Sequence, residues 1–195
     1  MKLRIRDIIL KLLLCLPILI GIYIVIFNLE NSLYKQMKLK NIQFEEVTIE
    51  RNIDWLFEFT QDISERRRWD KQTKSIEFIE GFNKLEKGAK VYVESSEGVP
   101  METIYLTFDP PNEISIQMLN RSYIFKNFIG SWNYISKTKN STSLKITYQY
   151  DLRFPFSLFR KKISQRIKNN MKQKLQLLNN HLSNTSREAN NIIEQ

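Results

Sequence analysis

Residues 157–183 read SLFRKKISQRIKNNMKQKLQLLNNHLS, and this stretch decides the fold. Its large apolar side chains recur every three or four positions, at Phe159, Ile163, Ile167, Met171, Leu175, Leu178 and Leu182. This spacing places them along one face of a long helix, with polar and basic side chains on the other face. We expect the apolar face to pack on a sheet formed by the preceding chain.

The sequence before this helix has the alternating pattern of β-strands. We expect a first strand at 43–49, followed by two short helices, one capped by Asn52 or Asp54 and one over 63–69. About six more strands follow, at 74–80, 89–93, 101–108, 113–118, 121–135 and 144–152. This order predicts an α+β fold, in which a curved antiparallel sheet of about seven strands wraps on the C-terminal helix and leaves space for a ligand.

A second hydrophobic stretch lies near the N-terminus. No charged side chain occurs from Leu12 to Leu29, and with Ile8–Leu10 this run is long enough to cross a hydrocarbon layer of about 30 Å. Small residues of the kind that signal peptidases recognise are lacking at its end, and also before Cys15. We expect one transmembrane helix at 8–29, which divides the chain into an anchor (1–30), a tether (31–41), a folded domain (42–183) and a polar tail (184–195).

Charge is distributed unevenly along the chain. The formal net charge is +9, yet residues 41–154 hold fifteen Lys or Arg against seventeen Asp or Glu. Residues 155–195 hold eight against two, so the basic excess lies beside the apolar run and on the last helix. This pattern favours an anionic membrane surface over nucleic acid as the partner. The basic residues flanking the apolar run narrowly favour a cytoplasmic N-terminus, with the domain on the opposite side.

Several segments resemble a known superfamily in their order along the chain. They are VTIERNIDWLFEF at 47–59, Arg68-Trp69-Asp70, Gly81 with LEKGAKV at 85–91, FDPPNEI at 108–114, and the closing helix. Together they resemble the START-like or helix-grip superfamily (SRPBCC), in particular its polyketide cyclase/dehydrase and lipid transport group. The resemblance covers about 140 residues and excludes the N-terminal run. It implies an apolar ligand pocket without identifying the occupant, because this fold supports many functions.

Candidate site residues follow from the expected inward faces. The pocket candidates are Trp69, Tyr105, Tyr123, Phe125, Tyr148, Tyr150, Ile163, Ile167 and Met171. The candidates for an acidic headgroup or a membrane surface are basic, because guanidinium and ammonium groups pair with carboxylate or phosphate: Arg66, Arg67, Arg68, Lys161, Lys168 and Lys172. Arg160, Lys162, Arg166 and Lys174 are also expected on the basic face of the helix.

Catalytic motifs are lacking in this sequence. His181 is a lone histidine expected at the surface, and Asp70, beside three arginines, is expected to end the helix or to form a salt bridge. We assign no catalytic residue, no metal ligand and no cofactor. The favoured hypothesis is a membrane-anchored, non-enzymatic protein that binds a lipid or another hydrophobic small molecule. The alternatives are a cyclase/dehydrase-type enzyme, in which pocket tyrosines together with Asp70 or Arg68 would position an enolisable substrate, and a structural or interaction module.

Overall fold

The computed structural model describes residues 16–26 and 41–193, including the side chains of 16–26 and 41–185. The chain forms two compact units, Met1–Lys38 and Leu39–Gln195. Residues 16–26 of the first unit are helical. Within the described ranges, no helix is both long enough and apolar enough to cross a membrane. Residues 8–15 and 27–29 of the expected span, and residues 31–40 of the expected tether, lie outside these ranges.

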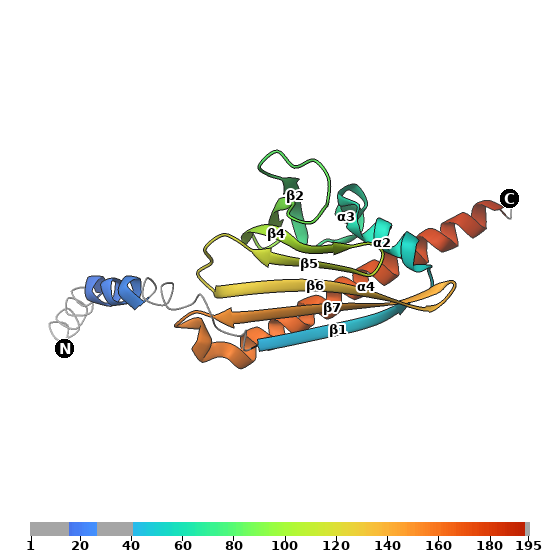
Figure 1. The fold of residues 1–195 in the computed structure, drawn as a ribbon. Helices are drawn as coiled ribbons and strands as arrows, with labels where there is room; N and C mark the ends of the chain where they lie inside the picture. Colours follow the sequence, from blue (N-terminus) through green and yellow to red (C-terminus); the bar gives the residue numbers. More distant parts are fainter. Residues whose placement is uncertain (1–15, 27–40, 194–195) are drawn as a thin grey trace. The chain divides into compact units, whose positions relative to one another are not determined.

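The second unit contains a single antiparallel sheet, which confirms the expected α+β architecture (Figure 1). The sheet has seven strands in the order β1-β7-β6-β5-β4-β3-β2, so the first strand pairs with the last. Their bounds are β1 Asn41–Ile49, β2 Thr73–Phe78, β3 Lys90–Ser95, β4 Pro100–Asp109, β5 Glu113–Met118, β6 Phe125–Thr138 and β7 Ser141–Leu152.

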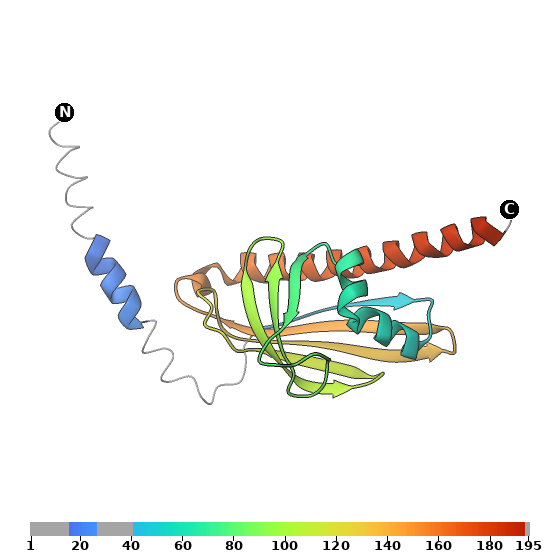
Figure 2. The same ribbon diagram turned by 90° about the horizontal axis from the view of Figure 1, so that it is seen from above.

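Three α-helices and one 3₁₀ helix complete the unit: α2 Ile53–Gln61, α3 Ile63–Trp69, η1 Phe156–Phe159 and α4 Arg160–Ile193. Helix α4 runs along one face of the sheet (Figure 2). Asn52 is the N-cap of α2, and its side chain accepts a hydrogen bond from the Trp55 backbone N–H at 2.8 Å. Asp62 caps α3 in the same way, accepting from the Ser64 and Glu65 N–H groups.

Two boundaries differ from the sequence-based expectation by more than three residues. The helix expected at 157–183 continues to Ile193, because residues 184–193 include neither Gly nor Pro to end it. The strand expected from Arg121 begins at Phe125 instead. The Ser122 hydroxyl accepts hydrogen bonds from the Ile124 and Phe125 N–H groups at 3.2 Å each, and this local turn replaces the start of the strand.

The packing of α4 on the sheet changes along the helix. From Met171 to Leu182, the inward side chains of Met171, Leu175, Leu178 and Leu182 are at most 5% exposed and belong to the main apolar core. Nearer the start of the helix, Ile163 and Ile167 pack against a second buried cluster, formed by Met118, Phe128, Tyr150 and Leu152, and are only half-buried. The sheet residue Tyr148, which packs against both core clusters, is half-buried as well. The inward side chains of α4 are therefore closely covered from Met171 to Leu182 and less completely covered around Ile163 and Ile167.

Candidate ligand-binding site

Helix α3 presents three functional side chains on one face. Arg66, Trp69 and Asp70 are spaced i, i+3 and i+4, so they lie together on the helix surface. Trp69 is 2% exposed, and Asp70 is completely buried. The Arg66 Nε lies 3.3 Å from the Asp70 Oδ2, and 18% of the arginine side chain is exposed. Of the three consecutive arginines, Arg66 is therefore the one that points toward the interior.

Asp70 also joins α3 to the long helix. The Lys174 Nζ lies 2.5 Å from the Asp70 Oδ2, and Thr73 donates its hydroxyl to the same oxygen at 2.8 Å. Burial by itself raises the pKa of the Asp70 carboxyl, but the Lys174 and Arg66 charges outweigh that effect and hold the pKa at about 2. The carboxylate is therefore ionised at neutral pH, which confirms the expected salt bridge.

Two cations surround this single carboxylate. Asp70 is the ion-pair partner of both Arg66 and Lys174, and no second carboxylate pairs with either cation in the described part of the chain. Lys174 is 7% exposed, so its charge is nearly as buried as that of Asp70. With Arg66 and Lys174 both protonated, the three groups sum to one positive charge, although burial and the Arg66 charge lower the pKa of Lys174. A buried charge without a partner is costly, so an anion placed here would be stabilised.

Aromatic side chains surround the Arg66 guanidinium. Its Cζ lies 5.0 Å from the centroid of the Trp132 ring, within cation–π range. The Trp132 ring centroid is 6.3 Å from that of Trp69. The Trp69 Nε1 is buried and has no hydrogen-bond acceptor among the described residues. A buried N–H without a partner is uncommon and points to a missing acceptor.

Tyr105 and Tyr148 complete the surroundings of Arg66. Their hydroxyls make no hydrogen bond within residues 41–185, and neither do the two Nη groups of Arg66. Burial raises the pKa of Tyr148 to about 12, and the nearby Arg66 charge only partly opposes this rise. Burial raises the pKa of Tyr105 in the same way. Both hydroxyls therefore keep their protons at neutral pH and can donate hydrogen bonds.

A glycine shapes the floor of this region. Gly130 of β6 pairs with Ile116 of β5 on one side and with Tyr148 of β7 on the other. A Cβ at Gly130 would lie 3.3 Å from the Tyr148 ring and 3.5 Å from the Ile116 Cγ1. Because Gly130 has no side chain, the Tyr148 ring can pack close to the backbone of β6, in the same cluster as Ile163 and Ile167 of α4.

The pocket candidates from the sequence fall into two neighbouring clusters and one outlier. Trp69, Tyr105 and Met171 belong to the main core, with Tyr148 and Ile167 at its margin. The second cluster holds Tyr150, with Phe125 and Ile163 packed against it. Tyr150 donates its hydroxyl to the Ser164 Oγ at 2.8 Å. Tyr123 is 74% exposed in the β5–β6 connection and lies in neither cluster, because the strand begins only at Phe125.

The basic candidates divide between interior and surface. Arg67 donates to the Ile76 carbonyl at 2.7 Å, and Arg68 pairs with Glu65 on the exposed face of α3. Lys161, Lys168 and Lys172 are exposed on α4. An open depression of about 500 Å³ runs along this polar face of α4, lined by Lys161, Lys162, Gln165, Arg166, Asn169 and Asn170.

The structure corrects the expected position of Lys174. It was expected on the basic outer face, but it is buried against Asp70. Its position is three residues after Met171 and four before Leu178, which places it inside the apolar stripe of the helix. This spacing could have predicted that Lys174 is buried. The many other basic residues of the helix made an exposed position look more plausible.

The site is poor in groups for acid–base chemistry. Asp70 is held ionised, and the interior tyrosines are held neutral. His181, half-buried, stacks on Phe59 with ring centroids 6.0 Å apart. Within the described residues, no three His, Cys, Asp or Glu side chains gather as metal ligands would. The arrangement can bind and orient an anionic or polar group next to apolar surface, but it offers no obvious proton acceptor.

Comparison with known proteins gives the fold. No family model matches the sequence, and no curated protein matches it. Three solved structures illustrate the structural likeness. The Zhui aromatase/cyclase from Streptomyces sp. R1128 is 15% identical, with a TM-score of 0.65, over 76% of this chain and 97% of that one. A START superfamily protein from Mycobacterium smegmatis is 12% identical, with a TM-score of 0.59, over 73% and 99%.

The third is the di-domain ARO/CYC BexL from the BE-7585A biosynthetic pathway, which is 12% identical with a TM-score of 0.62. The match covers 74% of this chain but only 47% of BexL. At these identities the likeness shows the fold alone. The expected helix-grip fold, an antiparallel seven-stranded sheet with a long C-terminal helix, is therefore confirmed for the folded unit.

Proposed function

We propose that the folded unit is a non-enzymatic binding protein for a lipid or another largely apolar small molecule, held between the sheet and the N-terminal half of α4. One observation carries this proposal. Ile163, Ile167 and Tyr148 face the interior yet stay half-buried, whereas Met171, Leu175, Leu178 and Leu182 further along α4 are at most 5% exposed. An apolar ligand in contact with these side chains would remove the remaining apolar surface from water, at about 25 cal/mol per Å².

Polar groups beside this apolar surface support binding. The Arg66 Nη groups and the Tyr105 and Tyr148 hydroxyls have hydrogen-bonding capacity to spare in the described structure. A few polar groups that converge on an otherwise apolar site are typical of small-molecule pockets. The cyclase/dehydrase alternative has weaker support, because the Asp70 carboxylate is engaged by two cations and the tyrosines cannot serve as bases near neutral pH.

Native mass spectrometry of the full chain, released from a mild detergent, tests this function. We expect a fraction of the protein to carry one additional small molecule, and activation energy in the gas phase to remove it. Replacement of Ile167 by Asp should abolish this species, whereas Gln165→Asp on the exposed face of the same helix should keep it. Bare protein in every preparation, together with no binding of added fatty acids, would contradict the proposal.

We propose further that the apolar run at 8–29 anchors the protein in a bilayer, with the N-terminus in the cytoplasm and the folded unit on the opposite side. The support comes from the sequence run and from the charge distribution. The described part of the run, residues 16–26, is helical and rich in exposed apolar side chains. Such a helix gains free energy by transfer into lipid.

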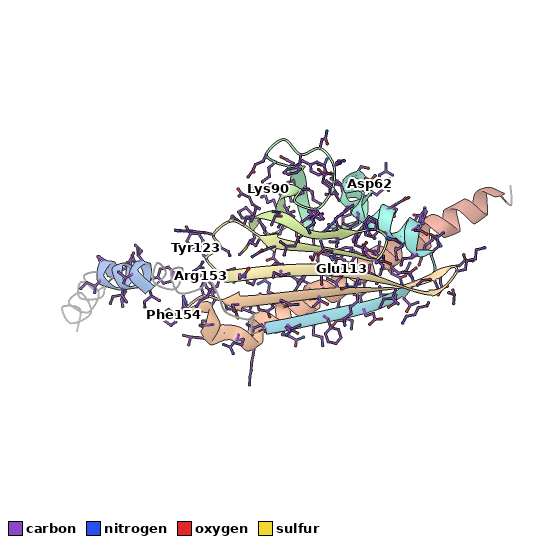
Figure 3. The ribbon with its side chains drawn as sticks, viewed as in Figure 1. Asp62, Lys90, Glu113, Tyr123, Arg153 and Phe154 are labelled. Atoms are coloured by element: carbon purple, nitrogen blue, oxygen red, sulfur yellow. The ribbon has the colours of Figure 1, made fainter. Side chains whose placement is uncertain are left out.

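The folded unit has a surface suited to the same bilayer. Leu158 is 71% exposed and Phe159 is 56% exposed, immediately before Arg160 and Lys161. Figure 3 shows Tyr123 and Phe154 at the same end of the sheet, where β6 begins and β7 ends. Exposed apolar and aromatic side chains beside basic ones are typical of surfaces that meet anionic lipid headgroups.

Membrane attachment and sidedness have separate tests. Alkaline carbonate should leave the full chain in the membrane pellet, and the double change Ile18→Arg and Ile22→Arg should release it. Each arginine costs about 2.5–3.5 kcal/mol at the centre of a span. For sidedness, an impermeant maleimide applied to intact cells should label an Asn184→Cys variant. Labelling only after lysis would reverse the proposed orientation.

A further inference from the structure

We infer that the ligand of this domain carries a carboxylate, and that Arg66 binds it beside Tyr105, Tyr148 and the Trp69 Nε1. The inference rests on the proposed binding function and specifies the chemical class of its ligand: an apolar molecule with one carboxyl group.

The charge of the cluster comes first. Asp70 is shared by Arg66 and Lys174 at 3.3 Å and 2.5 Å, which leaves the three groups with a net charge of +1. Asp70 and Lys174 are at most 7% exposed, so water screens this charge poorly. One added carboxylate makes the cluster neutral, whereas a phosphate dianion would leave it negative.

The geometry of Arg66 comes second. Asp70 engages the Nε edge, and the two Nη groups make no hydrogen bond to any residue in 41–185. The Trp132 ring, 5.0 Å from the Cζ, fixes the orientation of the guanidinium plane. A planar guanidinium with two free N–H groups on one side matches the two oxygens of a carboxylate. Unlike Asp70, which is fully buried, the Arg66 side chain keeps 18% of its surface accessible.

Uncommitted donors near Arg66 come third. The Trp69 Nε1 is buried without an acceptor, and the Trp69 ring neighbours the same Trp132 ring over which Arg66 lies. The Tyr105 and Tyr148 hydroxyls are protonated at neutral pH and feel the Arg66 charge. All three groups can donate hydrogen bonds, as a carboxylate requires. A neutral or cationic headgroup would leave several of these donors unsatisfied.

The experiment compares two probes of nearly the same shape on the full chain in a non-ionic detergent. The probes are 2-naphthoate and 2-naphthamide, and their dissociation constants are measured by isothermal titration calorimetry at pH 7. We expect the carboxylate to bind on the order of tenfold to a hundredfold more tightly, as charge-assisted hydrogen bonds allow. This ratio in the unmodified protein tests the inference without any variant.

Two variants then test which residue distinguishes 2-naphthoate from 2-naphthamide. Arg66→Gln should bring the ratio close to one, because it should weaken the binding of 2-naphthoate far more than that of 2-naphthamide. Arg68→Gln, on the exposed face of the same helix, should keep the full ratio. If both probes bind the unmodified protein equally, the carboxylate inference fails and the binding function stands. If neither probe nor any fatty acid binds, the binding function itself fails. A ratio that survives Arg66→Gln assigns the carboxylate to another group and overturns the role of Arg66.

Discussion

Replacement of Asp70 by Asn gives the sharpest test of how the two helices are joined. The Asp70 pKa is about 2, against an ordinary value of 3.8, and at about 1.36 kcal/mol per pH unit this difference corresponds to about 2.4 kcal/mol of stability at neutral pH. Asparagine removes that contribution and also leaves Arg66 and Lys174 without their anion. Breaking a buried pair in this way typically costs about 3–5 kcal/mol, and we expect a loss in that range.

The assay is urea unfolding of the full chain, followed by tryptophan fluorescence at pH 7. Glu65→Gln is the matched control, because it breaks an exposed ion pair with Arg68 on the same helix. The control should lose no more than about 1 kcal/mol. A loss of less than about 1 kcal/mol in Asp70→Asn would refute the reasoning, since the carboxylate would then contribute no more than a surface charge.

The pH dependence gives the same prediction a second readout. The folded-state pKa of Asp70 lies below its unfolded value, so its contribution is fully present above pH 3.8 and is lost as the pH falls towards 2. We expect the stability difference between the unmodified chain and Asp70→Asn to be constant from pH 5 to 7 and to narrow between pH 3.8 and 2. If the stability difference between the two proteins stayed constant down to pH 2, the lowered pKa of Asp70 would not be its cause.

Three further predictions concern residues of the helices and the sheet that support the site. Leu178→Ala, at a fully buried position, should cost about 2–5 kcal/mol in urea unfolding, whereas Ile163→Ala should cost clearly less; equal losses would contradict the change in packing along α4. Gly130→Val should lower stability by about 1–3 kcal/mol and weaken 2-naphthamide binding, because the new side chain meets the Tyr148 ring; unchanged affinity would remove Tyr148 from the site. Asn52→Ala should cost about 1 kcal/mol through loss of the α2 cap, without changing either probe's affinity.

Most of the fold was predictable from the sequence, because its signals are local. The apolar period of three to four residues between Phe159 and Leu182 predicted the long helix, and alternation predicted the strands. The second short helix was predicted with its observed bounds, Ile63–Trp69. The start of β6 was less predictable, because Tyr123 and Ile124 have strand-like side chains while Ser122 holds a turn through its hydroxyl.

The site was only partly predictable, because its charges come from distant segments. The sequence marked Arg66, Arg67 and Arg68 as a group without showing which of the three points inward. Asp70 and Lys174 lie 104 residues apart, so no local pattern announces their ion pair. The close packing at Gly130 could likewise not be predicted, because its neighbours Ile116 and Tyr148 come from two other strands. Long-range pairing of β5, β6 and β7 creates that contact.

Photochemical labelling with a diazirine-bearing aryl carboxylic acid tests the central claim most directly. After irradiation of the full chain, digestion and mass spectrometry locate the modified residues. We expect labels on interior positions such as Ile163, Ile167 and Tyr148, and we expect unmodified 2-naphthoate to compete for them. Labels confined to the exposed basic face of α4, around Lys161 and Arg166, would contradict a ligand held between the sheet and the helix.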